Sequence, residues 1–279
     1  MSGSFHAAGS WLVPATGVAI EHGTLMSGMA GKQAVLLGET HDRYDIHRWQ
    51  LHILAGLHAH KSAIVVGFEM FPRRCQPVLD KWVAGGLDTQ SFLEEVEWKS
   101  VWGFAPELYL PIFHFCRQFK LPMKALNCQR ALVTEVGKLG WDAIPLTDRD
   151  SVSPAKPATP AYRQYLFDIT GGARPDRKAA SADDPEFDRF VRAQQTWDRA
   201  FACNMAEAHR TANMPLVVGI IGRGHLEYGY GTPFQLADLG LEDVAVLLPS
   251  DAAFQADADP SRGAIADAIF RLDTGRERD

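Results

Sequence analysis

Five short apolar runs, separated by longer segments with helical spacing, most constrain how this chain can fold. The runs are AVLLGE (34–39), AIVVGFEM (63–70), MKALN (123–127), PLVVGIIG (215–222) and DVAVLLP (243–249). They are rich in β-branched residues and leucine, which favour strands, and the second run is almost continuously apolar, as in a sheet covered on both faces. Strands that alternate with helical segments predict an α/β fold, with a mainly parallel sheet flanked by helices.

Helical patterns fill the intervals between the apolar runs. They cover about 43–61, 73–84, 88–97, 106–119, 129–138, 160–170 and 186–212, and a short helix is expected near 261–271. Residues 145–187 contain many Pro, Ala, Ser, Asp and Arg residues, which indicates a loop inserted into the fold. The expected organisation is an N-terminal extension (1–33), a single α/β domain (34–250) with a helical and flexible insertion at about 145–212, and a C-terminal tail (251–279).

The composition of the 279 residues is that of an ordinary globular protein, with 46% hydrophobic and 22% charged residues. A net charge of −6 without a long basic run argues against nucleic acid as a partner.

The N-terminal residues lack the basic and apolar regions of a secretory signal, and no apolar run reaches the length of a membrane span. No membrane anchor is seen, so as written the chain is expected in the cytoplasm, or in the periplasm if a leader has been removed. The four cysteines show no CxxC spacing and are expected to be reduced thiols.

Two of the apolar runs end in a Gly-x-x-His turn. LLGETHD (36–42) contains the first turn and GRGH (222–225) the second. In open α/β sheets, ligands bind outside the carboxyl ends of the strands. The polar residues expected at those ends are Glu39, His41, Glu69, Asn127 and His225. The pattern therefore predicts a ligand crevice at this edge of the sheet.

Histidines and carboxylates that converge from separate strands suit two kinds of chemistry. His41, Glu69 and His225 could hold a divalent metal with an activated water. Without a metal, the same groups could act as an acid and base pair. Glu69 stands in an apolar strand, where a carboxylate is costly unless something pairs with it. A ligand site is therefore the favoured interpretation.

Aromatic and basic residues stand near these strand ends in the sequence. Tyr109 follows a tryptophan-rich segment, and Tyr230 stands between two glycines in a turn. A phenolate can ligate ferric haem iron, as histidine can, and flat aromatic surfaces suit a macrocycle. Arg73 and Arg130, together with Arg74 and Arg223, could pair with haem propionates or with another anionic group.

Several longer motifs occur in a fixed order over most of residues 34–250. They are LLGETHD, FEMFPRRCQ, NCQRAL, AQQTWDRAFACNMAE and GRGHLEYGYGTPFQL. This order resembles that of the ChaN-like haem-binding proteins, which belong to the wider Tiki/ChaN superfamily. The resemblance implies an α/β sheet with a helical insertion, and haem binding in iron acquisition, with ligation by a tyrosine and haem-linked dimerisation. Tyr230 and Tyr109 are the motif tyrosines that match best. Some more distant relatives are metal-dependent proteases or esterases, and their active site would correspond to His41, Glu69 and His225.

The sequence leaves two functional hypotheses open. The first is a haem-binding protein of iron uptake or haem handling, which forms a homodimer and holds haem with Tyr230, Tyr109, His41, Arg73 and Arg130. The alternative is a metal-dependent hydrolase, protease-like or esterase-like, with a divalent transition metal on His41, Glu69 and His225. In that case Glu39 and Glu69 would be the catalytic groups.

Overall fold

The fold class predicted from the sequence is confirmed by a computed structural model, which describes residues 6–171, 179–254 and 260–273. The strands are β1 (Trp11–Val13), β2 (Val18–Ile20), β3 (Ala34–Glu39), β4 (Ile64–Pro72), β5 (Met123–Asn127), β6 (Leu216–Gly222), β7 (Val244–Ser250) and β8 (Ala268–Arg271). Within the described residues they form one sheet in the order β2-β1-β8-β7-β3-β6-β4-β5. The pairings from β8 through to β5 are parallel, and both pairings of β1 are antiparallel. The sheet is therefore mainly parallel.

One edge of the sheet is built from both ends of the chain. Strands β1 and β2 form a short hairpin, and β8 lies between β1 and β7. The helix expected near 261–271 is wrong, because Pro260–Arg262 forms only a single 3-10 turn and Ala268–Arg271 is a strand. Main-chain pairing on both sides of β8 outweighs a weak local preference for helix.

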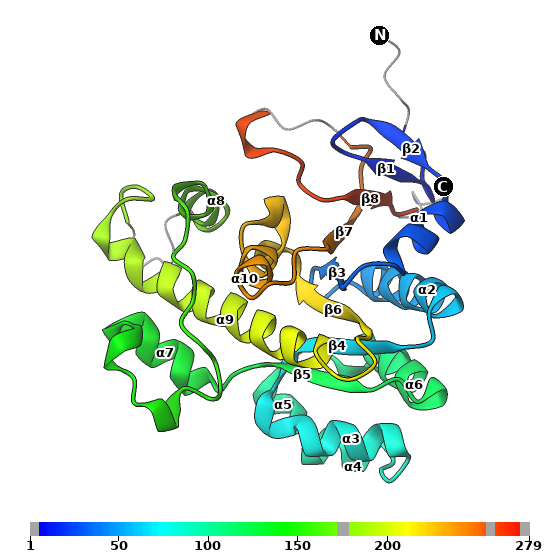
Figure 1. The fold of residues 1–279 in the computed structure, drawn as a ribbon, viewed down its shortest axis with the longest axis horizontal. Helices are drawn as coiled ribbons and strands as arrows, with labels where there is room; N and C mark the ends of the chain where they lie inside the picture. The colour runs from blue at the N-terminus through cyan, green and yellow to red at the C-terminus, as the bar shows by residue number, and fades with distance from the viewer. Residues whose placement is uncertain (1–5, 172–178, 255–259, 274–279) are drawn as a thin grey trace, which may run out of the picture.

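Helices cover both faces of the sheet (Figure 1). They are α1 (His22–Met29), α2 (Tyr44–His60), α3 (Gln76–Ala84), α4 (Thr89–Glu95), α5 (Trp98–Val101), α6 (Leu110–Phe119), α7 (Arg130–Leu139), α8 (Pro160–Thr170), α9 (Pro185–His209) and α10 (Thr232–Asp238). One buried cluster packs α2 and α6 against one face, and a second packs α9 and α10 against the other. Strand β3 contributes Val35 and Leu37 to the first cluster and Leu36 to the second, because successive side chains of a strand point to opposite faces.

Several helices begin later than the sequence pattern suggests. The pattern at 73–84 starts with a 3-10 turn, Arg73–Cys75, and the α-helix begins at Gln76 with a proline in its first turn. Proline favours this position because the first amide groups of a helix need no intrahelical acceptor. Helix α8 has the expected bounds.

None of the described helices combines the length and the apolar character that crossing a membrane requires.

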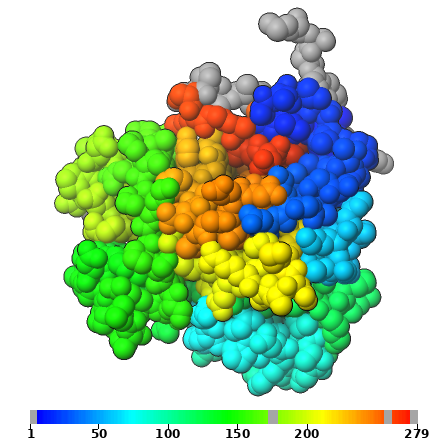
Figure 2. Space-filling model, viewed as in Figure 1, coloured from blue at the N-terminus to red at the C-terminus, as the bar shows by residue number. Residues whose placement is uncertain are grey.

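The insertion expected at about 145–212 contains α8 and α9, and residues 172–178 within it lie outside the described residues. Helix α9 begins after Asp184, whose carboxyl group accepts a hydrogen bond from the Glu186 amide. It then contacts α7, α10, β5 and β6, so it belongs to the layer that covers the sheet. In Figure 2, the green and yellow-green surface of α7, α8 and the start of α9 forms one side of the molecule.

Candidate functional site

A cavity of about 560 Å³ lies at the carboxyl ends of β3, β4, β5 and β6. Its volume is within the range typical of small-molecule sites. Four of the polar residues predicted at the strand ends line it: His41, Glu69, Asn127 and His225. The fifth, Glu39, is buried directly behind His41. The structure therefore brings these residues together from separate strands.

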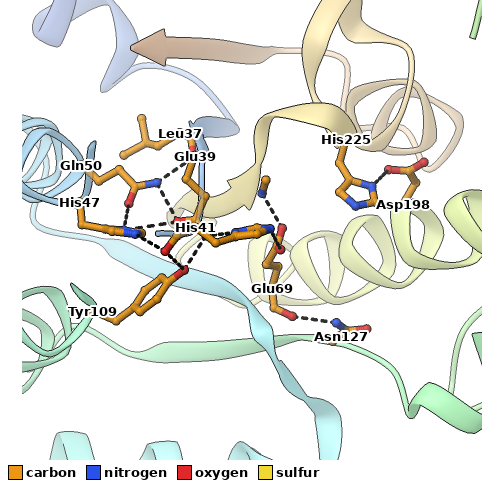
Figure 3. Close-up of polar contacts among 11 residues, drawn as sticks. Leu37, Glu39, His41, His47, Gln50, Glu69, Tyr109, Asn127, Asp198 and His225 are labelled. Atoms are coloured by element: carbon orange, nitrogen blue, oxygen red, sulfur yellow. Dashed lines mark hydrogen bonds and ion pairs between the residues drawn. The ribbon is translucent and has the colours of Figure 1, made fainter. Parts of the chain in front are cut away.

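His41 is held from behind by a buried carboxyl group. Its Nδ1 lies 2.7 Å from Oε1 of Glu39, whose side chain is 0% exposed. The hydroxyl of Tyr109 donates to the same oxygen at 2.9 Å, and Nε2 of Gln50 donates to Oε2 at 3.2 Å (Figure 3). Because these neighbours use Glu39 as an acceptor, Nδ1 of His41 is the donor and Nε2 is left on the cavity side. We call His41, Glu39 and Tyr109 the His41 unit.

His225 is held in a similar way, by two residues of the helical insertion and one of α10. Its Nδ1 lies 2.8 Å from Oδ1 of Asp198, which is fully buried in α9. The hydroxyl of Tyr162 in α8 donates to Oδ2 at 2.6 Å, and that of Thr232 donates to Oδ1 at 3.1 Å. His225, Asp198 and Tyr162 form the His225 unit. The two units have the same order of groups: tyrosine hydroxyl, buried carboxyl, imidazole.

Glu69 lies between the two histidines (Figure 3). Its Oε1 is 3.6 Å from Nε2 of His41, and its Oε2 accepts the backbone N–H of Gly222. Asn127 donates from Nδ2 to the Glu69 carbonyl at 2.8 Å, which fixes the backbone at this point of β4. Burial raises the pKa of Glu69, and the nearby His41 and His225 only partly oppose it. The centre of the site is therefore a buried carboxyl group that keeps its proton to higher pH than an exposed glutamate does.

Close packing explains why the first residue of each Gly-x-x-His turn is glycine, because neighbouring atoms leave little room for a Cβ. A Cβ at Gly222 would lie 3.0 Å from Cε1 of His41 and 3.4 Å from Oε2 of Glu69. A Cβ at Gly38 would lie 2.2 Å from Cδ2 of Leu248. Glycine at 222 thus lets the end of β6 lie close to His41 and Glu69, whereas glycine at 38 leaves room for the core residue Leu248.

Aromatic side chains pack beside each histidine. The ring of His41 lies 4.8 Å from that of Trp102 and 5.3 Å from that of Phe104. The ring of His225 lies 5.3 Å from that of Phe201, with Trp197 next to it. All four aromatic residues line the cavity. Flat apolar rings therefore form part of the cavity wall, beside the polar groups at the strand ends and the side chains of Arg74 and Arg130.

Carboxyl neighbours raise the pKa of both histidines. Burial alone would lower the pKa of His41, but its hydrogen bond to Glu39 and the charge of Glu69 outweigh that effect. Burial likewise opposes charging of His225, and the charge and hydrogen bond of Asp198 outweigh it, so the pKa of His225 is also raised. Both imidazoles therefore keep a proton to higher pH than a free histidine does.

The stability of the protein should depend on pH through His225. A raised folded-state pKa gives stability that is fully present below the unfolded value of about 6.5 and is lost as pH rises through the folded pKa. We expect the free energy of unfolding of the wild type, relative to His225→Gln, to fall above about pH 6.5. Urea unfolding at several pH values measures this difference, with a matched substitution at the exposed His60 as the control. If the stability of the wild type relative to His225→Gln instead increases with pH, the pKa of His225 is not raised by folding.

The tyrosines predicted to bind a ligand lie away from the cavity surface. Tyr109 is 0% exposed and donates its hydroxyl to Glu39. Burial and the neighbouring Glu39 raise the pKa of Tyr109, which disfavours the phenolate. Tyr230 is half-buried, and its hydroxyl donates to the carbonyl of Arg262 at 3.4 Å. It packs in a group of four tyrosines: Tyr162, Tyr165, Tyr228 and Tyr230.

The arginines divide into two sets. Arg73 donates from Nη1 to Glu207 and to Asn204, both at 2.6 Å, and so is held on the surface of α9. Arg130 and Arg74 line the cavity and are exposed. Arg130 forms no ion pair with any described residue, whereas an ion pair holds Arg74. Arg130 and Arg74 are thus the sequence-predicted arginines that the structure brings to the cavity.

Two other features bear on the chemistry of the site. Glu39, His41 and Glu69 each offer one ligand atom, and these atoms lie within 4.8 Å of one another. His225, expected in the metal set, lines the same cavity but is outside this group. Cys128 also lines the cavity, and burial raises its pKa to about 12. It is therefore a thiol at neutral pH, which argues against a cysteine nucleophile.

Asp198, Tyr162 and Thr232 are site residues that the sequence analysis missed. Asp198 stands on the buried face of α9 with Phe201 and Met205. A carboxyl group on the apolar face of a helix is costly unless it is paired. That signal was present in the sequence, but the partner on another element could not be identified from it.

Comparisons with known proteins identify the family and the fold. A family model described as haem-binding uptake, Tiki superfamily, ChaN matches residues 25–236. No curated protein matches the chain.

Among solved structures, the chain is similar to one described as cofacial haem binding to ChaN of Campylobacter jejuni. The TM-score is 0.69, the identity is 20%, and 96% of each chain is covered. It is also similar to the type III effector HopBA1, with a TM-score of 0.50, 11% identity, and coverage of 89% of this chain and 91% of that chain. An erythromycin esterase mutant in its open conformation gives a TM-score of 0.47 and 12% identity over 86% of this chain and 76% of that chain. At 20% identity, the likeness to the ChaN structure is one of fold.

Proposed function

The chain belongs to the ChaN-type haem-binding uptake family of the Tiki superfamily, and we propose that it binds haem in the cavity between His41 and His225. The observation that carries the proposal is the donor set. Each histidine has its Nδ1 held by a buried carboxyl group, so its Nε2 is the nitrogen on the cavity side. Bound haem would supply an iron centre that takes a ligand from the protein.

The other cavity residues fit the same ligand. Trp102, Phe104 and Phe201 offer flat apolar surfaces for a macrocycle. Arg130 and Arg74 stand at the cavity as cations for the propionates. The cavity is large enough for a small-molecule cofactor, and its two kinds of surface match the apolar ring and the anionic edge of haem.

His225 is the better candidate for the iron ligand. The Nε2 of His41 faces Glu69 at 3.6 Å, so an approaching metal would have to compete with that contact. The Nε2 of His225 makes no hydrogen bond to any described residue. The family precedent of a tyrosine ligand fits Tyr109 poorly, because its hydroxyl is buried against Glu39. Tyr230 remains the tyrosine alternative, on a surface outside the cavity lining.

A haemin titration followed at the Soret band tests the proposal. The wild type should give a saturable shift at a fixed ratio of haem to chain. His225→Ala should weaken binding by more than the roughly 10- to 100-fold that loss of a supporting group costs. His60→Ala, which removes an exposed histidine at the end of α2, is the matched control. Unchanged binding in His225→Ala and His41→Ala, with loss in Tyr230→Phe, would move the site to the tyrosine group.

A role in iron uptake or haem handling is the proposed use of this binding, and a homodimer is the proposed form of the loaded protein. The family description supports the uptake role, and the dimer rests on the haem-linked dimerisation that the family resemblance implies. Light scattering of the purified protein with and without haemin tests the dimer: the mass should double on loading, and an unchanged monomer mass would contradict it.

A metal-dependent hydrolase is the second candidate, and the group formed by Glu39, His41 and Glu69 favours it. Carboxylate oxygen and imidazole nitrogen are suitable ligands for divalent transition metals. In this case His225 would act as an acid or base opposite the metal. The candidate requires stoichiometric metal in purified protein and its loss in Glu69→Gln. Ester hydrolysis that persists in metal-free protein would exclude the metal-dependent form.

A further inference from the structure

Asp198 is a buried carboxyl group in the middle of a long helix. It is 0% exposed and lies on the face of α9 that packs against the sheet. Burial of a carboxyl group is costly unless hydrogen bonds satisfy its oxygens. Three side chains do so, and they come from three different elements: Tyr162 from α8, His225 from the turn after β6, and Thr232 from α10.

These contacts fix the orientation of the carboxyl group. Oδ2 accepts from Tyr162 at 2.6 Å, while Oδ1 faces Nδ1 of His225 at 2.8 Å and accepts from Thr232 at 3.1 Å. Rotation of the carboxyl group would break all three contacts. Space is also tight on the Oδ1 side, since a Cβ on Gly231 would lie 2.7 Å from it. The carboxyl group is therefore a rigid acceptor aimed at one nitrogen of His225.

We propose that Asp198, held by Tyr162, is the positioning residue of His225: it keeps the proton on Nδ1 and turns Nε2 toward the cavity. The inference rests on the proposed haem site and extends it from the strand ends to the helical insertion. Asp198 thus has the same role for His225 as Glu39 has for His41: its carboxyl group accepts a hydrogen bond from Nδ1 of the imidazole. In metal sites, a carboxyl group often accepts a hydrogen bond from the ring nitrogen of a histidine that does not bind the metal. This contact fixes the orientation of the ring and increases the basicity of the ligating nitrogen.

Asp198→Asn is the first test, because it keeps the size of the side chain and weakens the acceptor. Haemin affinity should fall about 10- to 100-fold. If His225 binds the iron, the iron–histidine stretching frequency of the reduced complex should also fall, because a less basic imidazole binds iron more weakly. Tyr162→Phe should give smaller changes in the same direction. Asp188→Asn, at a half-buried position of α9 where the carboxyl group pairs with Arg163 and not with the site, is the matched control.

A second readout needs no haem. Nitrogen NMR of the His225 ring, at a pH high enough to leave it neutral, reports which nitrogen carries the proton. Wild type should show the Nδ1–H form, and Asp198→Asn should populate the other tautomer. If haemin does not bind but the tautomer result is as expected, the proposed function fails and the positioning role stands. An Nε2–H tautomer in the wild type, or a folded Asp198→Asn variant with unchanged tautomer and affinity, overturns the inference.

Discussion

Replacing Glu39 with alanine is expected to lower the free energy of unfolding by about 3–5 kcal/mol, the range found when one partner of a buried ion pair such as Glu39–His41 is removed. The carboxyl group accepts from Tyr109 and Gln50 and faces Nδ1 of His41. Alanine would remove this buried acceptor, leaving Tyr109 only its longer contact of 3.4 Å with the His41 carbonyl and Gln50 only the Leu37 carbonyl. A buried donor left unsatisfied costs its full desolvation free energy. Urea unfolding at neutral pH measures the change.

Glu95→Ala provides the comparison for this experiment. Glu95 is exposed and forms a surface ion pair with Lys81. Exposed pairs contribute only about 0.2–1 kcal/mol. A loss in Glu39→Ala no larger than that of Glu95→Ala would mean that the Glu39 contacts are not maintained in solution, and the His41 unit would then lose its support.

Replacing Gly231 with alanine is expected to lower the free energy of unfolding by about 1–3 kcal/mol, as overpacking does in a filled interior. Its Cβ would lie 2.5 Å from the carbonyl oxygen of His225 and 2.7 Å from Oδ1 of Asp198. Backbone and a buried carboxyl group can move little, so the clash should separate the two groups of the His225 unit. We therefore expect weaker haemin binding together with lower stability, measured by Soret titration and thermal unfolding of the same preparation.

Gly28→Ala is the matched control for Gly231→Ala. Gly28 lies within α1, and no atom would lie within 4 Å of its new Cβ. Alanine is favoured over glycine in a helix by up to about 1 kcal/mol, so this variant should be as stable as the wild type or slightly more so. If Gly231→Ala behaves like Gly28→Ala in both measurements, the close packing around Asp198 is not a feature of the protein in solution.

The central strands could be predicted from the sequence because their residues are buried on both sides. Strand β3 is an apolar run whose six residues are all buried, and its bounds agree with those expected. Strands β1, β2 and β8 could not be found in this way. Each is only three or four residues long, too short for a periodic pattern, and β8 depends on pairing with partners from other parts of the chain.

Part of the candidate site could be predicted because its residues follow strands that the sequence itself indicates. His41 and His225 follow strands directly, so topology places them at one edge of the sheet. The link between Asp198 and His225 joins a helix to a turn across 27 residues, and it depends on how the insertion packs. Tyr109 was identified as a site residue through the family resemblance, and its contact with Glu39 behind the cavity required the structure.

Diffraction from crystals of the haemin-loaded protein at the iron absorption edge tests the central claim most directly, because the anomalous signal locates the iron without a model of the ligand. The account predicts one strong peak per chain inside the cavity, within bonding distance of Nε2 of His225 or of His41. A peak beside Tyr230, outside the cavity, would contradict the account and assign haem binding to the tyrosine group.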